Sequence, residues 1–336
     1  MYSPPSKRDP STRLGIGLIG LGRHGMRYAK HLAEDFPRAR LAGFTRKDTA
    51  QAARDAKALG VPAYPDYRAL IAAPDVDAVA VVVPPVFHPD IVAEAAERGK
   101  AVLLEKPAAI NLEDGLRLRR SVSAGNIPVM VAQTMRYNET VAVLMSERHR
   151  IGRLHSVRIS QRFEPSPTSW IYDPIAGGGT TLQTGVHGFD LMRFLTGLEA
   201  IRVSAEMGNV REGAYEDNFS AVVQLTENAI GTVSGSRATS GRTGSIELVG
   251  DAGQLVADHV LRTAVFISGS TMTPLSIPPP VSTIALALAD FLDSLERGGP
   301  MPISLDDGLK AVALAEAATT AARTGRATPV ASPESL

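Results

Sequence analysis

Three glycines near the start of the chain have the spacing of a phosphate-binding turn. Residues 14–25 read Leu-Gly-Ile-Gly-Leu-Ile-Gly-Leu-Gly-Arg-His-Gly, which gives the pattern Gly-x-Gly-x-x-Gly at Gly20, Gly22 and Gly25. The pattern follows an apolar strand and opens an amphipathic helix, the context in which it binds a dinucleotide. The first glycine permits the tight turn, the second lets a pyrophosphate approach, and the third allows close helix packing. We predict a dinucleotide site; a glycine-rich turn without a ligand is the alternative.

The residues after the next predicted strand indicate which dinucleotide binds. A protein that binds NAD usually has an acidic residue about 20 residues after the glycine turn, for the ribose 2′-hydroxyl. This chain has Thr45, Arg46 and Lys47 there, and the nearest carboxylate comes three residues after Thr45. A hydroxyl and two cations suit a 2′-phosphate, so we predict NADP as the preferred cofactor, with NAD as the alternative. Arg23 and His24, inside the turn, complete the expected contacts; solvated surface charge is the other interpretation of the two cations.

The composition is that of an ordinary globular protein. The chain has 336 residues, enough for two domains, of which 44% are hydrophobic and 21% charged. Lys plus Arg equals Asp plus Glu at 35 each, which leaves no electrostatic footprint for nucleic acid or an anionic membrane. The lack of cysteine excludes disulfides, thiolate metal sites and cysteine nucleophiles, and is compatible with the cytoplasm, where we expect the protein. Residues 1–13 have no apolar signal-peptide core, and no window approaches about 18 uninterrupted apolar residues.

In the first part of the chain, short apolar runs alternate with helical patterns, which is typical of a parallel sheet covered on both faces. Strands are predicted at Leu14–Ile19, Ala39–Phe44, Ala78–Val83, Ala101–Glu105 and Pro128–Ala132. Helices are predicted at Gly25–Glu34, Thr49–Leu59, His88–Arg98 and Leu112–Ala124, the last three followed by cap glycines at Gly60, Gly99 and Gly125. We therefore expect a disordered segment at 1–13 and a Rossmann dinucleotide-binding domain at 14–133.

The second part of the chain is β-rich and predicts an open, mostly antiparallel sheet. The strand candidates are Leu154–Phe163, Asn218–Leu225, Ile230–Arg237, Ser245–Val249 and Gln254–Asp258, with a hairpin signal at 250–253. Helices are expected at about Thr180–Leu195, Ile284–Arg297 and Asp306–Arg323, and Ser304 with Asp307 resembles a capping box for the last. We expect a substrate-binding α+β domain at 134–326, whose last helix (306–323) can pack back on the first domain, and a disordered tail at 327–336.

Four features, spread from residue 14 to about residue 330, resemble the Gfo/Idh/MocA family, the relatives of glucose–fructose oxidoreductase and inositol dehydrogenase. The glycine turn is the first. Glu105-Lys106-Pro107 stands at the end of a predicted strand, where the family has its Glu-Lys-Pro signature. Gly177-Gly178-Gly179-Thr-Thr-Leu-Gln-Thr-Gly-Val-His-Gly-Phe-Asp190 matches the glycine-triplet helix entry of the family, and residues 303–330 resemble its closing helix.

The resemblance implies an α/β fold with a Rossmann half and a second half built on an open antiparallel sheet. Family enzymes mostly oxidise a sugar or cyclitol hydroxyl to a ketone, or run the reverse. Carried onto this chain, Lys106 would be the catalytic lysine and His187 the acid/base. The family also implies a cis peptide bond before Pro107, which aims the lysine.

The resemblance also implies which residues border the cofactor. Glu105 would lie near the nicotinamide ribose. The loop that contains Val83 and Pro84 would border the dinucleotide together with His88. The expected cofactor residues therefore come from the carboxyl ends of several strands, where open α/β sheets bind ligands.

Elementary chemistry agrees with these two catalytic assignments. A hydride leaves a carbinol carbon only if a base takes the hydroxyl proton, and a neutral histidine that titrates near pH 7 suits that task. A lysine ammonium beside the same oxygen stabilises the developing alkoxide. A buried structural histidine is the alternative for His187, but its place in the motif favours function.

One residue departs from the pattern. The family often has Asp at the position of Gln183, four residues before His187 and so on the same helix face. Gln183 can hold the imidazole in place but carries no negative charge to stabilise an imidazolium. We therefore include Gln183 in the catalytic group and do not assign the chain to the inositol dehydrogenase branch itself.

Three further residues fall near positions that line the substrate cleft in relatives: Arg136, Trp170 and Tyr172. Trp170 is the only tryptophan and could form an aromatic platform for a sugar ring, with buried packing as the alternative. The histidines outside the motifs show no metal-ligand spacing, so we expect no metal.

The expected partners are a small sugar or polyol and a second copy of the chain, as a homodimer or homotetramer. We expect no nucleic acid or membrane partner. Two other functions stay open within the resemblance: an NAD-dependent glycosidase without net redox change, and a non-enzymatic nucleotide or sugar sensor. The presence of both Lys106 and His187 favours an enzyme over a sensor.

Overall fold

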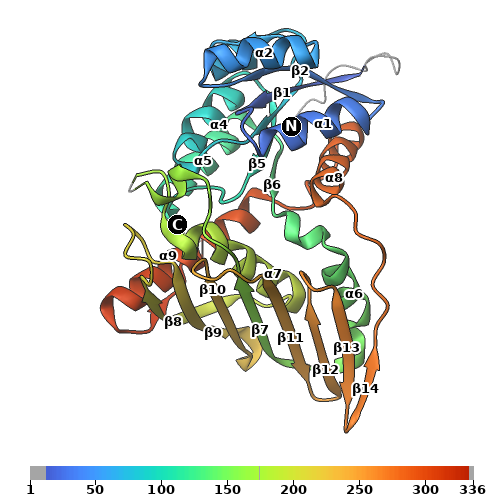
Figure 1. Cartoon of the computed structure of the whole chain (residues 1–336), viewed down its shortest axis with the longest axis vertical. Helices are drawn as coiled ribbons and strands as arrows, with labels where there is room; N and C mark the ends of the chain where they lie inside the picture. Colours follow the sequence, from blue (N-terminus) through green and yellow to red (C-terminus); the bar gives the residue numbers. More distant parts are fainter. Residues whose placement is uncertain (1–12, 174, 333–336) are drawn as a thin grey trace. The chain divides into compact units, whose positions relative to one another are not determined.

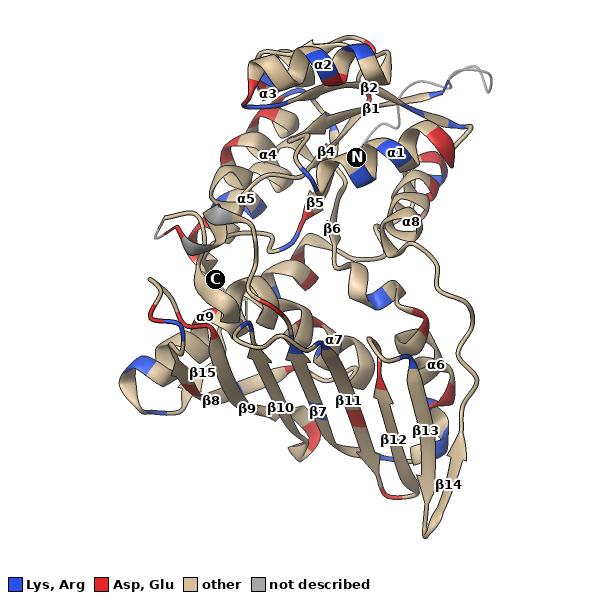
Figure 2. Cartoon of the chain, in the orientation of Figure 1, with Lys and Arg blue, Asp and Glu red and all other residues tan. Residues whose placement is uncertain are grey.

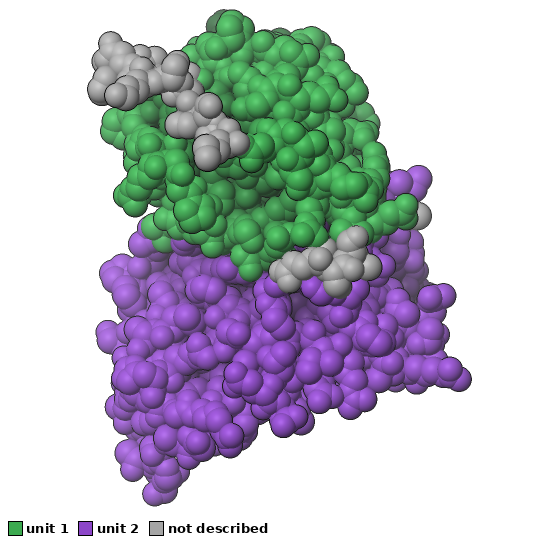
Figure 3. Space-filling model, turned by 180° about the vertical axis from the view of Figure 1, so that it is seen from behind, with its two compact units in different colours: residues 1–109, 113–132, 282–308 green, residues 110–112, 133–281, 309–336 purple. Residues whose placement is uncertain are grey.

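The computed structural model describes residues 13–173 and 175–332. They divide into two compact units, coloured in Figure 3. Unit 1 contains the residues up to 109, residues 113–132 and residues 282–308. Unit 2 contains residues 110–112, residues 133–281 and the residues from 309 onwards. Each unit is therefore built from separate stretches of the sequence.

Unit 1 is built on a six-stranded parallel sheet with the order β3-β2-β1-β4-β5-β6. The strands are β1 (Leu14–Ile19), β2 (Ala39–Thr45), β3 (Ala63–Tyr64), β4 (Ala78–Val81), β5 (Ala101–Glu105) and β6 (Val129–Ala132). β1, β4, β5 and β6 are buried along most of their length, as the continuous apolar runs predicted. The strand order reverses between β1 and β4, and ligands bind outside the carboxyl ends of the strands at such a point.

Helices cover both faces of the unit 1 sheet, with α1 and α8 on one side and α4 and α5 on the other (Figure 1). The helices are α1 (Gly25–Glu34), α2 (Thr49–Leu59), α3 (Tyr67–Ala72), α4 (His88–Glu97), α5 (Leu112–Gly125) and α8 (Thr283–Arg297), with a 3₁₀ turn at η1 (Pro85–Phe87). Asp48, Asp66 and Ser282 cap α2, α3 and α8 by accepting hydrogen bonds from backbone N–H groups.

The return of α8 to unit 1 differs from the domain division expected from the sequence, which placed residues 284–297 in the second domain. Arg38 Nη1 pairs with Glu296 Oε2 at 3.0 Å, and His31 Nε2 lies 2.8 Å from the hydroxyl of Ser282. The segment after α8 also pairs with β6. Val131 N donates to Ile303 O, and Ser304 forms an antiparallel bridge with Met130. These contacts join residues far apart in the sequence, and no local pattern encodes them.

Unit 2 is built on a nine-stranded mixed sheet with the order β14-β13-β12-β11-β7-β10-β9-β8-β15. The strands are β7 (Leu154–Arg162), β8 (Ala200–Gly208), β9 (Asn218–Leu225), β10 (Ile230–Ser236), β11 (Thr243–Gly250), β12 (Gly253–Asp258), β13 (Thr263–Ser268), β14 (Thr271–Pro274) and β15 (Thr328–Pro329). All neighbouring pairs are antiparallel except β7 with β10, which are parallel.

One face of this sheet is covered by helix α7 and carries the core of unit 2. The helical elements are α6 (Glu139–Glu147), α7 (Val186–Thr196), α9 (Leu305–Thr324), a π turn at η5 (Thr181–Gly185) and 3₁₀ turns at η2 (Thr134–Tyr137), η3 (Arg148–Ile151), η4 (Ser169–Tyr172) and η6 (Thr226–Asn228). Alternate residues of β9, such as Val223 and Leu225, are buried in one core with Phe189 and Met192 of α7. A Cβ at Gly188 would lie only 2.6 Å from Val233, so α7 packs closely on β10.

The predicted fold class is confirmed: a parallel Rossmann-like sheet and a mostly antiparallel second sheet. The hairpin at 250–253 is present, and Ser304 and Asp307 exchange the hydrogen bonds of a capping box. The predicted helix at about Thr180–Leu195 is present and contains a π turn at Thr181–Gly185. Two expectations were wrong. Gly125 belongs to α5 and Asn126 takes the left-handed conformation instead. Residues 328–329 form β15 and pair with β8, so this part of the tail is ordered.

Residues 1–12 and 333–336 lie outside the described residues, so the expected disorder at both ends is not addressed there. Basic and acidic residues are interspersed along the helices and strands of both units (Figure 2). Among the described residues, no helix combines the length and apolar character that a membrane crossing needs. In the same part of the chain, no group of three or more His, Asp and Glu side chains is arranged to hold a metal ion.

Candidate active site

The glycine turn between β1 and α1 is closed on one side and open on the other. Gly20 has a φ of +101°, and a Cβ there would lie 2.4 Å from the carbonyl oxygen of Val82. A Cβ at Gly25 would lie 2.1 Å from the carbonyl oxygen of Gly20, so only glycine lets α1 start this close to the strand. Nothing lies within 4 Å of a Cβ at Gly22. The open side and the amino end of α1 fit a pyrophosphate.

The end of β2 is tied to this turn. Gly20 N donates to the Thr45 hydroxyl at 3.2 Å, and Arg46 Nη1 donates to the carbonyl oxygen of Leu21 at 2.6 Å. Arg46 also forms an ion pair with Asp55 of α2 at 2.9 Å. The structure thus brings Thr45 and Arg46 to the glycine turn, while Lys47 is exposed beside them. Sequence reasoning missed Asp55, because its contact with Arg46 depends on how α2 packs.

The carboxylate of Glu105, at the carboxyl end of β5, is 7% exposed and accepts hydrogen bonds from three groups. Its Oε1 lies 2.7 Å from His24 Nε2 and 2.6 Å from the hydroxyl of Tyr28, and its Oε2 accepts from the backbone N–H of Lys106 at 3.0 Å. Burial alone would raise the pKa of Glu105. The hydrogen bonds from His24 and Tyr28, together with the electrostatic attraction of His24 and Lys106, outweigh burial and lower the pKa of Glu105.

Lys106 follows directly and is partly exposed, and the expected cis peptide bond to Pro107 is present. The hydrogen bond between His24 and Glu105 places this lysine beside the glycine turn. Tyr28 was missed by sequence reasoning. Its place four residues after His24, on the same face of α1, was the available signal.

The loop after β4 contains Val83 and Pro84, both partly buried. His88 differs from the expectation that it borders the cofactor, because its side chain has no accessible surface. Its ring nitrogens lie 3.0 Å from the carbonyl oxygen of Val83 and 3.1 Å from that of Ala108. Burial lowers the pKa of His88, although these backbone contacts oppose the shift. His88 therefore connects the loops that follow β4 and β5.

In unit 2, the glycine triplet forms the entry to η5. Gly178 and Gly179 have φ values of +76° and +77°, and a Cβ at Gly177 would lie 2.0 Å from the carbonyl oxygen of Ile171. The Glu216 carboxylate fills the space beside Gly179 and accepts the backbone N–H of Thr181 at 2.7 Å. Burial raises the pKa of Glu216, opposed by its hydrogen bonds with Thr181. The motif glycines thus shape the chain before the helix.

Gln183 and His187 lie on either side of the change from π turn to α-helix. Gln183 is buried, and its amide donates to the carbonyl oxygen of Gly177 at 2.5 Å. His187 is the second residue of α7 and is partly exposed. Arg237 Nε donates to the hydroxyl of Thr184 at 2.7 Å. A π turn of this kind is often found at functional sites.

The three expected substrate residues have different positions in unit 2. Arg136 forms a two-point ion pair with Asp190 of α7, with N–O distances of 2.6 and 2.8 Å, and its side chain is only 10% exposed. The Arg136 guanidinium also lies over the ring of Phe194, 5.0 Å from the centroid. Trp170 is partly buried in η4. Tyr172 belongs to the same turn, but its side chain lies outside the described residues.

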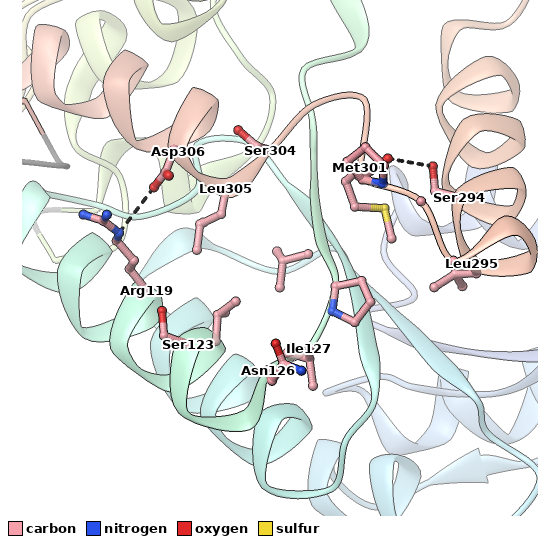
Figure 4. A pocket seen from close by; sticks show the side chains of 16 residues that line it. Arg119, Ser123, Asn126, Ile127, Ser294, Leu295, Met301, Ser304, Leu305 and Asp306 are labelled. Carbon is pink, nitrogen blue, oxygen red and sulfur yellow. Dashed lines mark hydrogen bonds and ion pairs between the residues drawn. The ribbon is translucent and has the colours of Figure 1, made fainter. Parts of the chain in front are cut away.

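A hollow of about 520 Å³ in unit 1 lies at the amino end of β6 (Figure 4). It is lined by the end of α5, the residues around Ile127 before β6, and the segment between α8 and α9. Arg119 and Asp306 form an ion pair of 3.4 Å across its rim. Lys106 follows the carboxyl end of β5, whereas this hollow lies at the amino end of β6. It is therefore separate from the candidate active site.

A doubly wound parallel sheet whose first strand leads through this turn into a helix defines the class of Rossmann dinucleotide-binding proteins. Residues 14–133 match the family described as "Oxidoreductase family, NAD-binding Rossmann fold", and residues 143–256 match the "GFO/IDH/MocA C-terminal domain". The chain belongs to the Gfo/Idh/MocA family of oxidoreductases.

Relatives match nearly the whole chain. It is 30% identical to an inositol 2-dehydrogenase of Rhizobium meliloti, over 90% of this chain and 95% of the relative. It is 25% identical to a scyllo-inositol 2-dehydrogenase (NAD(+)) of Bacillus subtilis, over 92% and 94%. The crystal structure of a probable dehydrogenase from Thermotoga maritima aligns with a TM-score of 0.83 and 27% identity, over 94% and 99%. The predictions of the family and of an NAD(P)-dependent oxidoreductase acting on CH–OH groups are confirmed.

Proposed function

We propose that this protein transfers a hydride between a nicotinamide dinucleotide and a secondary hydroxyl, or the corresponding ketone, of a cyclitol or sugar. The observation that carries the proposal is the hydrogen bond between His24 of the glycine turn and Glu105, the residue before Lys106. It puts a lysine next to a turn that fits the dinucleotide phosphates. The inositol dehydrogenases among the relatives support a polyhydroxylated ring as substrate.

A nicotinamide dinucleotide held at the glycine turn by Gly20, Gly22 and Gly25 would supply the hydride acceptor for the oxidative direction. We assign the proton of the substrate hydroxyl to His187, whose neutral imidazole can accept it. We assign to Lys106 the hydrogen bond to the same oxygen, where an ammonium stabilises the alkoxide as it develops. Gln183 holds the backbone at Gly177 and so helps to fix the start of the helix that carries His187. The ketone and a protonated His187 are the products of the step.

A substrate panel tests this proposal. The purified protein is incubated with NADP⁺ or NAD⁺ and a set of inositols, other polyols and aldoses, and the reduced nicotinamide is followed by its absorbance. We expect reduction with at least one cyclitol or sugar. Binding of the dinucleotide without reduction by any member of the panel, together with hydrolysis of a chromogenic glycoside, would favour the glycosidase instead.

The preference for NADP(H) is a finer proposal. Its support is the absence of a carboxylate at the end of β2 and the position of Arg46, which bonds to Leu21 inside the glycine turn. Asp55 and Leu21 hold the Arg46 guanidinium at this edge of the sheet. One relative has NAD(+) in its name, so this chain would differ from it.

Calorimetric titration with both dinucleotides tests the preference. Arg46→Ala should weaken NADP(H) binding by about 1–3 kcal/mol, the usual contribution of a charge-assisted hydrogen bond. The same change should affect NAD(H) binding much less. A lower dissociation constant for NAD(H) than for NADP(H) in the wild-type protein would show that the preference is wrong. We further propose a homodimer or homotetramer in the cytoplasm, which sedimentation and cell fractionation can test.

A further inference from the structure

The two oxygens of the Glu105 carboxylate accept hydrogen bonds from different parts of unit 1. Oε1 lies 2.6 Å from the Tyr28 hydroxyl and 2.7 Å from His24 Nε2. Oε2 accepts the backbone N–H of Lys106 at 3.0 Å. The carboxylate thus connects the helix that opens at the glycine turn with the residue we assign to the reacting oxygen.

The proposed reaction assigns no role to Tyr28. It is fully buried, and its ring meets the ring of His24 edge to face with the centroids 5.7 Å apart. A phenylalanine would fill the same volume. The hydroxyl therefore contributes only through its hydrogen bond to Glu105. Because it has no accessible surface, Tyr28 cannot touch a substrate or a dinucleotide directly.

The hydrogen bonds to Oε1 fix the rotation of the carboxylate. If they were removed, the side chain of Glu105 could turn, and Oε2 would no longer lie where the backbone N–H of Lys106 points. Lys106 begins the loop after β5, so a change in this peptide changes the direction of its side chain. A displacement of about 1 Å at a reacting group can cost as much as 100-fold in rate.

We propose that Tyr28 and His24 are positioning residues for the hydride-transfer reaction, and that they act on Lys106 through Glu105. This inference rests on the proposed function, because it assumes that Lys106 acts on the substrate. The charged or titratable groups that face the Glu105 carboxylate are His24 at the N-cap of α1, Tyr28 from α1, Lys106 after β5, and His88 from α4. Tyr28 has no accessible surface, so it can act on the reaction only through Glu105.

Tyr28→Phe is the test, with kcat, KM, dinucleotide affinity and thermal unfolding measured on the full chain. We expect kcat to fall about 10- to 100-fold, with KM and the dissociation constant of the dinucleotide within about twofold of wild type. The primary deuterium isotope effect on kcat should not fall, because the hydride step becomes slower. Tyr67→Phe is the matched control: its ring lies under the guanidinium of Arg68 in α3, and the variant should keep wild-type kcat.

A second pair of variants covers the case in which Tyr28→Phe does not fold. His24 is 46% exposed, so its replacement should leave the fold intact. His24→Gln keeps an N–H donor for Glu105 and His24→Leu removes it, while both remove the imidazole from the glycine turn. We expect kcat of His24→Gln to exceed that of His24→Leu about tenfold, at equal dinucleotide affinity.

Unchanged kcat in Tyr28→Phe, or equal kcat in the two His24 variants, would overturn the inference. A loss of kcat that is matched by weaker dinucleotide binding would also overturn it, because the carboxylate would then serve the cofactor site. Lys106→Ala separates this failure from failure of the proposed function. If Lys106→Ala turns over like wild type, the assignment of the lysine itself is wrong.

Discussion

The ion pair between Arg136 and Asp190 gives a sharp test of what Arg136 does. The sequence places Arg136 near the substrate, whereas the structure binds it to α7. Asp190 is 1% exposed, the arginine side chain is 10% exposed, and the two N–O distances are 2.6 and 2.8 Å. Removal of one partner from a buried pair leaves a buried charge and costs about 3–5 kcal/mol. Arg136→Met should therefore lower the free energy of unfolding by about that amount.

Urea unfolding followed by circular dichroism measures this change. Arg136→Met combined with Asp190→Leu should recover most of the loss, since no buried charge then remains. Arg242→Met is the matched control. It removes an exposed ion pair with Glu164, with 61% and 40% exposed side chains, and should leave the unfolding midpoint close to wild type. A loss below about 1 kcal/mol in Arg136→Met, with a large rise in KM, would refute the structural role and favour direct contact between Arg136 and the substrate.

Three further predictions concern the glycine turn, the carboxylate of β5 and the helix of His187. Gly25→Ala should lower the free energy of unfolding by more than about 2 kcal/mol, because its Cβ would lie 2.1 Å from the carbonyl oxygen of Gly20. Gly22→Ala should leave chemical unfolding unchanged and weaken dinucleotide binding in calorimetry. Equal unfolding midpoints for the two variants would contradict the turn geometry. The pKa of Glu105 is lower in the folded protein than in the unfolded chain, so its contribution to stability is present above the ordinary carboxyl pKa and is lost as the pH falls through the lowered pKa. In a pH series of chemical unfolding, Glu105→Gln should therefore show a shallower loss of stability below about pH 5. An unchanged slope would count against the hydrogen bonds that Glu105 accepts. Gln183→Asp should raise the pKa seen in the pH–rate profile, since a carboxylate near His187 favours the imidazolium; an unchanged profile would mean that the two side chains do not interact.

Much of the fold of unit 1 could be predicted because its strands are buried on both faces and its helices are amphipathic and capped. β1, β5, α1 and α2 have the predicted bounds. The two-residue β3 and the six-residue α3 were missed, because elements this short carry no periodic signal. In unit 2, β8 and β13–β15 were missed, since strands at or next to the two edges of the sheet expose many of their residues and carry a weak apolar pattern.

The candidate site shows the same difference between local and long-range information. Glycine spacing predicted the turn, and the geometry of Gly20, Gly22 and Gly25 agrees with the roles given to them. The partners of these elements come from elsewhere in the sequence. Asp55 reaches Arg46 only through the position of α2 in the fold, and Glu216 reaches the glycine triplet only through the residues just before β9. No spacing rule brings such pairs together without the three-dimensional fold.

Hydride transfer in His187→Ala and Lys106→Ala tests the central claim most directly. The assay mixes each variant, saturated with the oxidised dinucleotide, with the substrate identified in the panel and follows the reduced nicotinamide in a single turnover. We expect His187→Ala to be slower by about 10²–10⁴, the range for loss of a positioned acid/base, with dinucleotide affinity close to wild type. Lys106→Ala should also be severely impaired, and Lys106→Arg should not restore the rate, because a planar guanidinium cannot replace a compact ammonium. Near-normal hydride transfer in His187→Ala would mean that the proton leaves by another route and that the assigned site is wrong.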